Sequence, residues 1–535
     1  MTASAVPGAS TSPGGGIARS KNLALVAMLF AVAMTFIDQT IVAIASPDIQ
    51  SELDLTRSGT QWVVNAYLLA LAATFALGGR LADVLGPKRM VITGIVGFAA
   101  SSALCGATPH GSYAEAWLIG FRALQGASGA IMIPAALAIV VSSFEVAERG
   151  RAMAIFFGVS GGLTAIGPIA GGYLTQWTWR AIFWINVPIA VLAVVLAFAA
   201  GIGEVRRRER IDWRGAALVA AGMALSVLGF EQVPTWGWAN AWTWVCIVGG
   251  LAILAVFVAV TLRAPVPLLR LEVFRNRGFV VDNAVLFFSM IAFVPVFFFA
   301  SVYSQVSLGY GASDAGLYLL VLFAGFAPAA QIGGRMLDAG GAKRPMVIGG
   351  AVGTVGFALW AAKISDLSLG HQWYAIVLAG AGIGFLLGPA STDAVNRAIG
   401  ASYGEVTGIG QTLRNYGSSL GMAILGTLLS TVFAHRLTSS LTGLGVPADV
   451  AHSIAVDGSR SGGAGAGSSV PASIAHGVQS AVQADFALGV RAVLIGMAVA
   501  LGICLLLALA HPGDRVSDPA DTRDPAAAPG ADAVV

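Results

Sequence analysis

Long apolar segments follow one another along almost the entire chain, and they restrict its fold more than any other feature. A helix needs about 20 mostly apolar residues to cross the hydrocarbon core of a membrane. The sequence contains fourteen such segments, at residues 22–46, 61–82, 88–107, 116–142, 152–175, 181–202, 214–232, 242–262, 279–302, 315–336, 346–364, 372–395, 405–432 and 486–510. Of the 535 residues, 56% are hydrophobic and only 11% are charged, whereas soluble proteins carry about 25% charged residues. The sequence therefore predicts an all-α polytopic membrane protein with fourteen transmembrane helices in the cell membrane.

The positively charged residues lie mostly in alternate connecting segments, and this distribution predicts the orientation of the chain. Short cytoplasmic loops of membrane proteins carry an excess of Lys and Arg. The largest cluster follows the sixth span and consists of Arg206, Arg207, Arg208, Arg210 and Arg214. Both termini are therefore expected in the cytoplasm. Residues 1–21 and 511–535 are expected to be disordered from their composition, and residues 433–484 are expected to form a long outer loop.

Several functional classes are not expected from this sequence. The net charge is only +3, and no basic stripe lies beside stacking aromatics, so nucleic acid is not an expected partner. The three cysteines lie far apart in or beside apolar segments, so we expect neither a disulfide nor a metal site. There is no Gly-rich phosphate loop of an ATP-driven pump, and no span contains a histidine for a nucleophile–base pair. We therefore expect a protein that is not an enzyme and that needs no cofactor.

A short segment occurs twice in the chain and indicates how the spans are organised. Residues 78–89 read GGRLADVLGPKR, and residues 333–344 read GGRMLDAGGAKR. Internal repeats of this kind are typical of secondary transporter folds. Because each copy follows the second span of a six-helix unit, the repeat predicts two halves, at residues 22–202 and 279–510. The two remaining spans form an insertion within residues 203–278.

The repeated loop has the composition of a conformational element. Its glycines permit a tight turn, and its carboxylate and basic side chains can form ion pairs that break and reform as helices move. We assign this role to Gly79, Asp83, Gly86, Lys88, Arg89, Asp338, Lys343 and Arg344. The alternative is a turn that only anchors the topology through its positive charge.

Four motifs, in order along the chain, resemble those of a known family. Residues 79–89 are similar to the loop signature of the major facilitator superfamily, and residues 122–126, which read RALQG, resemble its drug-exporter motif. Residues 37–42 and 179–188 resemble its fourteen-helix drug:proton antiporter branch. The antiporter motif of its proton-coupled exporters is matched by Gly158, Gly167, Pro168, Gly171 and Gly172.

This resemblance extends from about residue 22 to residue 510 and implies a fold and an activity. It implies the major facilitator fold, arranged as 6 + 2 + 6 helices, and a multidrug exporter of the antiporter type. The sequence departs from the family pattern at Pro87, where many members have a basic residue, and at Ser46, where many have Leu. Because Pro87 carries no charge, it weakens the exchange of ion pairs expected of the loop.

Proton coupling requires a group that titrates inside the membrane, and Asp38 is the deepest acid in the expected spans. An acid within a transmembrane segment is costly and indicates function. Asp38 lies about 12 Å from the outer end of its span and Arg122 about 9 Å from the outer end of the fourth, at 1.5 Å per residue. We therefore expect a charge pair in which Asp38 alternates between a proton and Arg122 or the substrate. The alternative is a permanent structural ion pair.

Two further groups of residues complete the candidate site. The antiporter glycines leave a groove along the fifth span, which serves either as a hinge or seal against leak or as a packing seam for a neighbouring helix. Polar and aromatic residues within the outer halves of the first, second and fourth spans are candidates for lining a substrate cavity. They are Phe36, Gln39, Asn65, Tyr67 and Gln125.

Together these features predict a proton-coupled exporter of amphipathic organic compounds or drugs that works by alternating access. Its expected partners are a small-molecule substrate, protons and membrane lipid, and we expect a monomer. The principal alternative is a dedicated exporter of one natural product or metabolite. A more remote alternative is a non-transporting membrane sensor, although no soluble signalling domain is evident.

Overall fold

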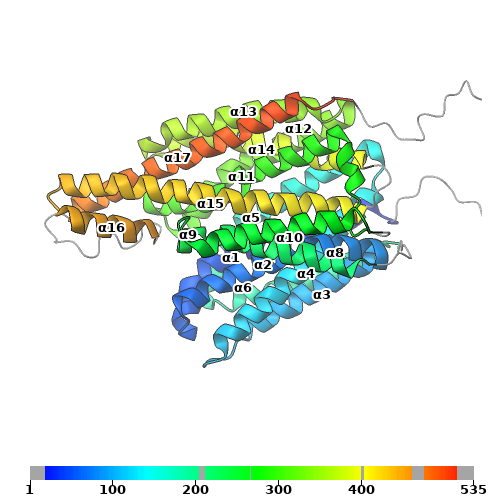
Figure 1. Cartoon of the computed structure of the whole chain (residues 1–535), viewed down its shortest axis with the longest axis horizontal. Coiled ribbons are helices and arrows are strands. Elements are labelled where there is room, and N and C mark those ends of the chain that lie inside the picture. Colours follow the sequence, from blue (N-terminus) through cyan, green and yellow to red (C-terminus); the bar gives the residue numbers. More distant parts are fainter. Residues whose placement is uncertain (1–17, 204–210, 265–266, 399–402, 461–474, 515–535) are drawn as a thin grey trace, which may run out of the picture.

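The computed structural model describes residues 18–203, 211–264, 267–398, 403–460 and 475–514, and within them it contains helices and connecting loops but no strand (Figure 1). The first part of the chain forms α1 (Lys21–Leu53), α2 (Arg57–Leu85), α3 (Pro87–Gly106), α4 (Ala114–Ser143), α5 (Val146–Trp177), the short α6 (Ala181–Trp184) and α7 (Asn186–Ala199). The middle part forms α8 (Trp213–Glu231), the short α9 (Val233–Trp236) and α10 (Ala241–Thr261). The last part forms α11 (Arg277–Val306), α12 (Ala312–Gly340), α13 (Lys343–Lys363), α14 (Leu369–Arg397), α15 (Tyr403–Gly443), α16 (Ala448–Arg460) and α17 (Ala475–Leu509).

Thirteen helical segments in the described part of the chain are long and apolar enough to cross a membrane. They correspond to every expected span except the fifth. That span, residues 152–175, falls within α5, a helix of 32 residues that is not among the thirteen. The segments of the middle part, α8 and α10, are both among them, so the insertion carries two helices of transmembrane length.

The helices pack as two groups that meet along a seam. One apolar core is built mainly from α1–α4, and another from α11–α14 with α17. Two helices cross between the groups: α5 packs against α12 and α14, and α15 packs against α2 and α4. Helix α8 covers the seam by packing against both α2 and α15, and α10 packs on α8 (Figure 1).

The repeated loop in the sequence is also a repeat in the backbone. Gly86 ends α2 with φ of 98°, and Gly341 ends α12 with φ of 83°. Residues with a side chain rarely adopt such positive φ values, so glycine is required at both turns. We call the end of the bundle that carries these two glycines the loop end; the sequence predicts that it faces the cytoplasm.

The sixth expected span is confirmed as Ala181–Ala199, with a one-residue break at Ile185 between α6 and α7. Two other expectations from the sequence require correction. Residues 433–484 are not simply a loop: α15 continues to Gly443, and α16 and α17 occupy much of the rest, while residues 461–474 lie outside the described part. The extension of α15 buries Phe433, Leu437 and Leu441, whose spacing of four residues is typical of a helix face.

The second correction concerns the ends of the chain. His511 was expected in a disordered tail, yet it is buried with 1% exposure, and the described structure continues to Asp514. At the other end, Ser20 caps α1 by accepting a hydrogen bond from the Leu23 N–H. The remainder of the two expected tails lies outside the described residues.

Candidate functional site

Asp38 of α1 and Arg122 of α4 are in contact inside the first helix group. The Arg122 guanidinium lies 2.5 Å from Asp38 Oδ2, and the two side chains are 1% and 0% exposed. Gln125, one turn along α4, donates from Nε2 to Asp38 Oδ1 at 2.9 Å. Both carboxylate oxygens are therefore occupied by donors from the same helix.

Arg122 has further partners that do not depend on Asp38. Its Nε donates to the Val63 carbonyl at 3.0 Å, and a terminal nitrogen donates to Gln125 Oε1 at 2.8 Å. The Tyr67 ring lies 4.3 Å from the centre of the guanidinium, at cation–π distance. A guanidinium held in this way keeps hydrogen-bond partners when Asp38 becomes neutral.

The expected cavity residues fall into two groups in the structure. Tyr67 and Gln125 are fully buried and pack directly on the charge pair, so here they support that pair rather than line an open space. Phe36, Gln39 and Asn65 are only half-buried. These three side chains remain candidates for contact with a substrate.

The glycines of the expected antiporter motif differ in their surroundings. A side chain at Gly167 would collide with Thr40 Oγ1 and would lie 2.9 Å from the Ile37 carbonyl of α1. Among the described residues, no atom lies within 4 Å of a Cβ atom added at Gly158. Gly171 is buried and Gly172 is half-buried, while the side chain of Pro168 lies outside the described set. Gly167 thus allows α5 to approach α1 within one or two residues of Asp38.

The second copy of the repeated loop joins the two helix groups at the loop end. Asp338 accepts hydrogen bonds from the Gly150 N–H at 3.1 Å and from the Arg151 N–H at 3.2 Å, both near the start of α5. These amides belong to the second turn of α5, whose N-cap is Glu145, so Asp338 acts here as a charged hydrogen-bond acceptor. A side chain on Gly150 would collide with Asp338, so the glycine permits this contact.

The first copy lies in the corresponding place at the seam. Near the end of α2, the Gly79 and Ala76 Cα atoms approach α15 so closely that a methyl group on Gly408 would lie 3.8 and 3.7 Å from them. Asp83 and Arg89 each have an interaction partner in the structure. Lys88 reaches the Phe198 ring at 5.4 Å, whereas Lys343 is half-buried and Arg344 is exposed.

Asp338→Asn is expected to weaken the contact between α12 and α5. The amide can accept only one of the two hydrogen bonds, and loss of a hydrogen bond costs about 1 kcal/mol, or roughly a fivefold shift in a conformational equilibrium. Spin labels on the exposed residues Glu145, at the start of α5, and Arg344, just beyond the end of α12, measure the distance between these two helices. We expect a larger fraction of molecules in which the two labels are far apart. The control is Asp314→Asn, at the opposite end of α12. An unchanged distance distribution in Asp338→Asn would contradict the proposed contact.

A buried ionic cluster joins the end of the described chain to the loop end of α11 and α14. Arg397 lies 2.5 Å from Asp393, 4.0 Å from Asp282 and 3.1 Å from Asp514. His511 Nε2 lies 3.1 Å from Asp393 and 3.4 Å from Asp282. The hydrogen bond from Arg397 holds the pKa of Asp514 below its usual range, so this link holds at neutral pH and is lost as pH falls through the lowered pKa.

Arg397→Gln is expected to destabilise the protein strongly. It would leave Asp282 and Asp393 buried without their guanidinium, and breaking a buried ion pair costs on the order of 3–5 kcal/mol. The measurement is thermal unfolding of the purified full-length protein. Arg275→Gln is the control, because Arg275 is an exposed arginine that lies a few residues before Asp282 and outside the cluster. Equal melting temperatures for the two variants would show that the cluster does not contribute to stability.

Sequence reasoning missed one group of buried polar residues at the seam. Arg414 of α15 is 7% exposed, and it donates to Gln411 Oε1 at 2.9 Å and to the Ser391 hydroxyl of α14. Its guanidinium lies 4.6 Å from the ring of Phe157 of α5, a residue that packs in the apolar core built mainly from α1–α4. The signal in the sequence was the Gln–Arg pair three residues apart, which mirrors Arg122 and Gln125 in reverse order.

The helices form two packed groups, and both copies of the repeated loop lie at the seam between them. Buried charges lie inside the groups and at the seam. This arrangement defines a secondary transporter fold. The family model of the Major Facilitator Superfamily matches residues 28–422. The chain belongs to this superfamily, whose members are transporters and not enzymes, and it is a multi-pass protein of the cell membrane.

Relatives of known name cover most of the chain. A tetracenomycin C resistance and export protein of Streptomyces glaucescens is 31% identical over 431 residues, which are 79% of each chain. A cephamycin export protein of Amycolatopsis lactamdurans is 33% identical over 76% of this chain and 84% of its own. Multidrug resistance protein 3 of Bacillus subtilis is 27% identical over 79% and 83%. The solved structure of a proton:xylose symporter shares the fold, with a TM-score of 0.54 at 13% identity over 89% of this chain and 94% of that one.

Proposed function

We propose that this transporter is a proton-driven exporter of amphipathic organic compounds that works by alternating access. Its similarity to proteins named for export of tetracenomycin C and cephamycin supports export as the direction of transport. The fold supports alternating access, because its two helix groups meet along a seam that can open at one end and close at the other. The proton gradient supplies the energy, so no cofactor is required.

The observation that carries the proton-coupling proposal is the set of contacts around Asp38. An acid buried in a membrane protein is stable as an anion only while it is paired. Arg122 supplies that pair, and it retains the Val63 carbonyl, Gln125 and the Tyr67 ring if the pair opens. Protonation of Asp38 therefore frees Arg122 without leaving it unsolvated, and deprotonation restores the ion pair.

The two states in this exchange are protonated Asp38 and ionised Asp38 paired with Arg122. If each orientation of the helix groups accommodates only one of these states, then proton transfer is coupled to substrate movement. Asp38 lies on α1, which packs against α5 at Gly167, and α5 packs against α12 across the seam. A shift of α1 that follows protonation of Asp38 can therefore be transmitted through α5 to the contact between the two helix groups. Protons enter from outside and leave inside while the substrate moves outward.

A dedicated exporter of one natural product remains the second candidate function. Two of the named relatives are named for single compounds, whereas another is named for multidrug resistance. Resistance profiles distinguish the two candidates when the chain is expressed in a host that lacks its own pumps. Resistance to many unrelated compounds supports the broad exporter, and resistance to one chemical series supports the dedicated one.

Transport by purified protein in vesicles tests the proposed function directly. Vesicles with an imposed pH gradient should move amphipathic dyes against their concentration gradient, and a protonophore should abolish that movement. Transport that continues after the pH gradient has collapsed would exclude proton coupling.

A further inference from the structure

Arg414 lies in a small pocket at the seam, where no carboxylate among the residues that the structure describes pairs with its charge. The pocket is lined by α4 and α5 from one helix group and by α11, α14 and α15 from the other. Its polar lining comes from the second group and consists of Asn283, Ser391, Thr407, Gln411 and Arg414. A site with walls from both groups changes shape whenever the groups move relative to each other.

Arg414 differs from the buried Arg122 in one respect. Arg122 is paired with the Asp38 carboxylate at 2.5 Å. Among the described residues no ion pair to a carboxylate is found for Arg414, and its Nε has no hydrogen-bond partner. A buried cation without a counter-ion is costly, and such groups in transmembrane segments mark substrate or ion pathways.

A second unsatisfied group points into the same pocket. Asn283 is 3% exposed, and its Oδ1 has no hydrogen-bond partner, while its Nδ2 donates to the Phe279 carbonyl at 2.9 Å. The remaining wall is apolar, with Leu137, Met153, Phe157, Leu286 and Val406 among its residues. A cation and hydrogen-bonding groups on one side, and apolar side chains on the other, fit a ligand with one anionic end and an apolar body.

We propose that Arg414 binds the anionic group of the exported substrate, and that the substrate class is amphipathic organic carboxylates. The guanidinium presents a planar fork of donors that matches a carboxylate. Gln411 and Ser391 hold that fork in place, and the face of Phe157 lies beside it. This inference rests on the proposed export function, because it assigns the substrate class to the cavity between the two halves.

The present conformation explains why the site is small. The cavity has a volume of about 20 Å³, which is enough for a water molecule but not for a substrate. Asp338 and Gly150 hold the two groups together at the loop end. Separation of the groups at that end opens the walls of the pocket on the side that an exporter must load, so Arg414 becomes accessible when the substrate enters.

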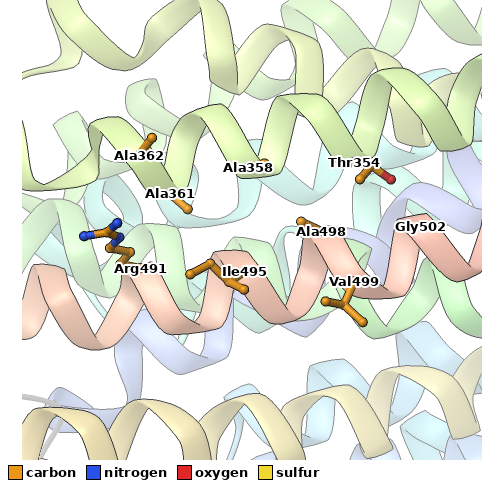
Figure 2. Close-up of a pocket in the computed structure, with 9 residues that line it drawn as sticks. All are labelled: Thr354, Ala358, Ala361, Ala362, Arg491, Ile495, Ala498, Val499 and Gly502. Carbon is orange, nitrogen blue, oxygen red and sulfur yellow. The ribbon is translucent and has the colours of Figure 1, made fainter.

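The test compares an acid with its uncharged derivative. Full-length protein in lipid nanodiscs is titrated with tritiated 1-pyrenebutyrate and with its methyl ester, and empty nanodiscs correct for partition into lipid. The variants are Arg414→Gln, which removes the charge, and Arg414→Lys, which keeps the charge but loses the fork. Arg491→Gln is the matched control, because Arg491 is also an arginine of a membrane-spanning helix but lines an apolar surface groove between α13 and α17 (Figure 2).

We expect the wild-type protein to bind the acid at least tenfold more tightly than the ester. Arg414→Gln should lose this preference while binding the ester as the wild type does, Arg414→Lys should be intermediate, and Arg491→Gln should be unchanged. Equal binding of acid and ester by the wild type, or an equal loss of both in Arg414→Gln, would overturn the proposal. Transport in vesicles separates this outcome from failure of the proposed function: selective binding without any pH-driven transport rejects proton-driven export but leaves the anion site.

Discussion

Replacing Asp38 with asparagine is expected to reduce proton-driven export to the level of protein-free vesicles while leaving a folded protein. Asparagine has almost the same shape as aspartate and still accepts a hydrogen bond, but it cannot exchange a proton. The protonated, neutral state of Asp38 is a working state of the proposed cycle, so the fold must tolerate it. Arg122 keeps the Val63 carbonyl and Gln125 as partners in that state. The measurements are dye transport and thermal unfolding, with Asp48→Asn, an exposed acid on the same helix, as control.

A permanent structural ion pair makes the opposite prediction for the same variants. Removal of one partner of a buried pair then costs on the order of 3–5 kcal/mol, so Asp38→Asn should unfold at lower temperature. The double variant Asp38→Asn with Arg122→Gln should restore both stability and export, because no buried charge remains unpaired. Under proton coupling the double variant is stable but inactive. Export by the double variant would therefore refute the coupling role of Asp38.

Replacing Gly167 with alanine is expected to lower both stability and transport. The added methyl group would collide with Thr40 and lie 2.9 Å from the Ile37 carbonyl, so α1 and α5 would have to separate. Overpacking of this kind costs about 1–3 kcal/mol. Asp38 lies next to Ile37 in α1, so the same shift disturbs its alignment with Arg122. Thermal unfolding and dye transport per amount of folded protein measure the two effects.

Gly158→Ala is the matched control for that prediction. No atom in the part of the chain that the structure describes lies within 4 Å of the added methyl group, and alanine is a better helix former than glycine by roughly 0.5–1 kcal/mol. We expect this variant to be at least as stable as the wild type and equally active. If Gly167→Ala is also stable but allows protons to leak without substrate, then Gly167 belongs to a hinge or seal rather than to a packing seam.

The sequence predicts the architecture well because the membrane imposes strong rules on it. A helix that crosses lipid must be apolar over about 20 residues, and thirteen of the expected spans coincide with such helices. The repeated loop indicates two related units because its glycines are needed for the same positive φ at two turns, Gly86 and Gly341. These features depend on local chemistry, which is readable along the chain.

Contacts between distant segments are harder to read from the sequence. The depths of Asp38 and Arg122 in their helices suggest the pair, since both residues are costly in lipid and of opposite charge. The pocket around Arg414 depends on how α5 and α15 cross the seam, which no spacing in the sequence specifies. His511 looks like part of a polar tail, and only the packing of α11 against α14 shows that two buried acids lie beside it.

Proton release on substrate binding provides the sharpest test of coupling through Asp38. Purified protein in weakly buffered solution with a pH indicator is mixed with a transported compound. We predict that the wild type and Asp48→Asn release protons in proportion to bound substrate, and that Asp38→Asn binds substrate without releasing any. Proton release by Asp38→Asn equal to that of the wild type would contradict a coupling role for this carboxylate.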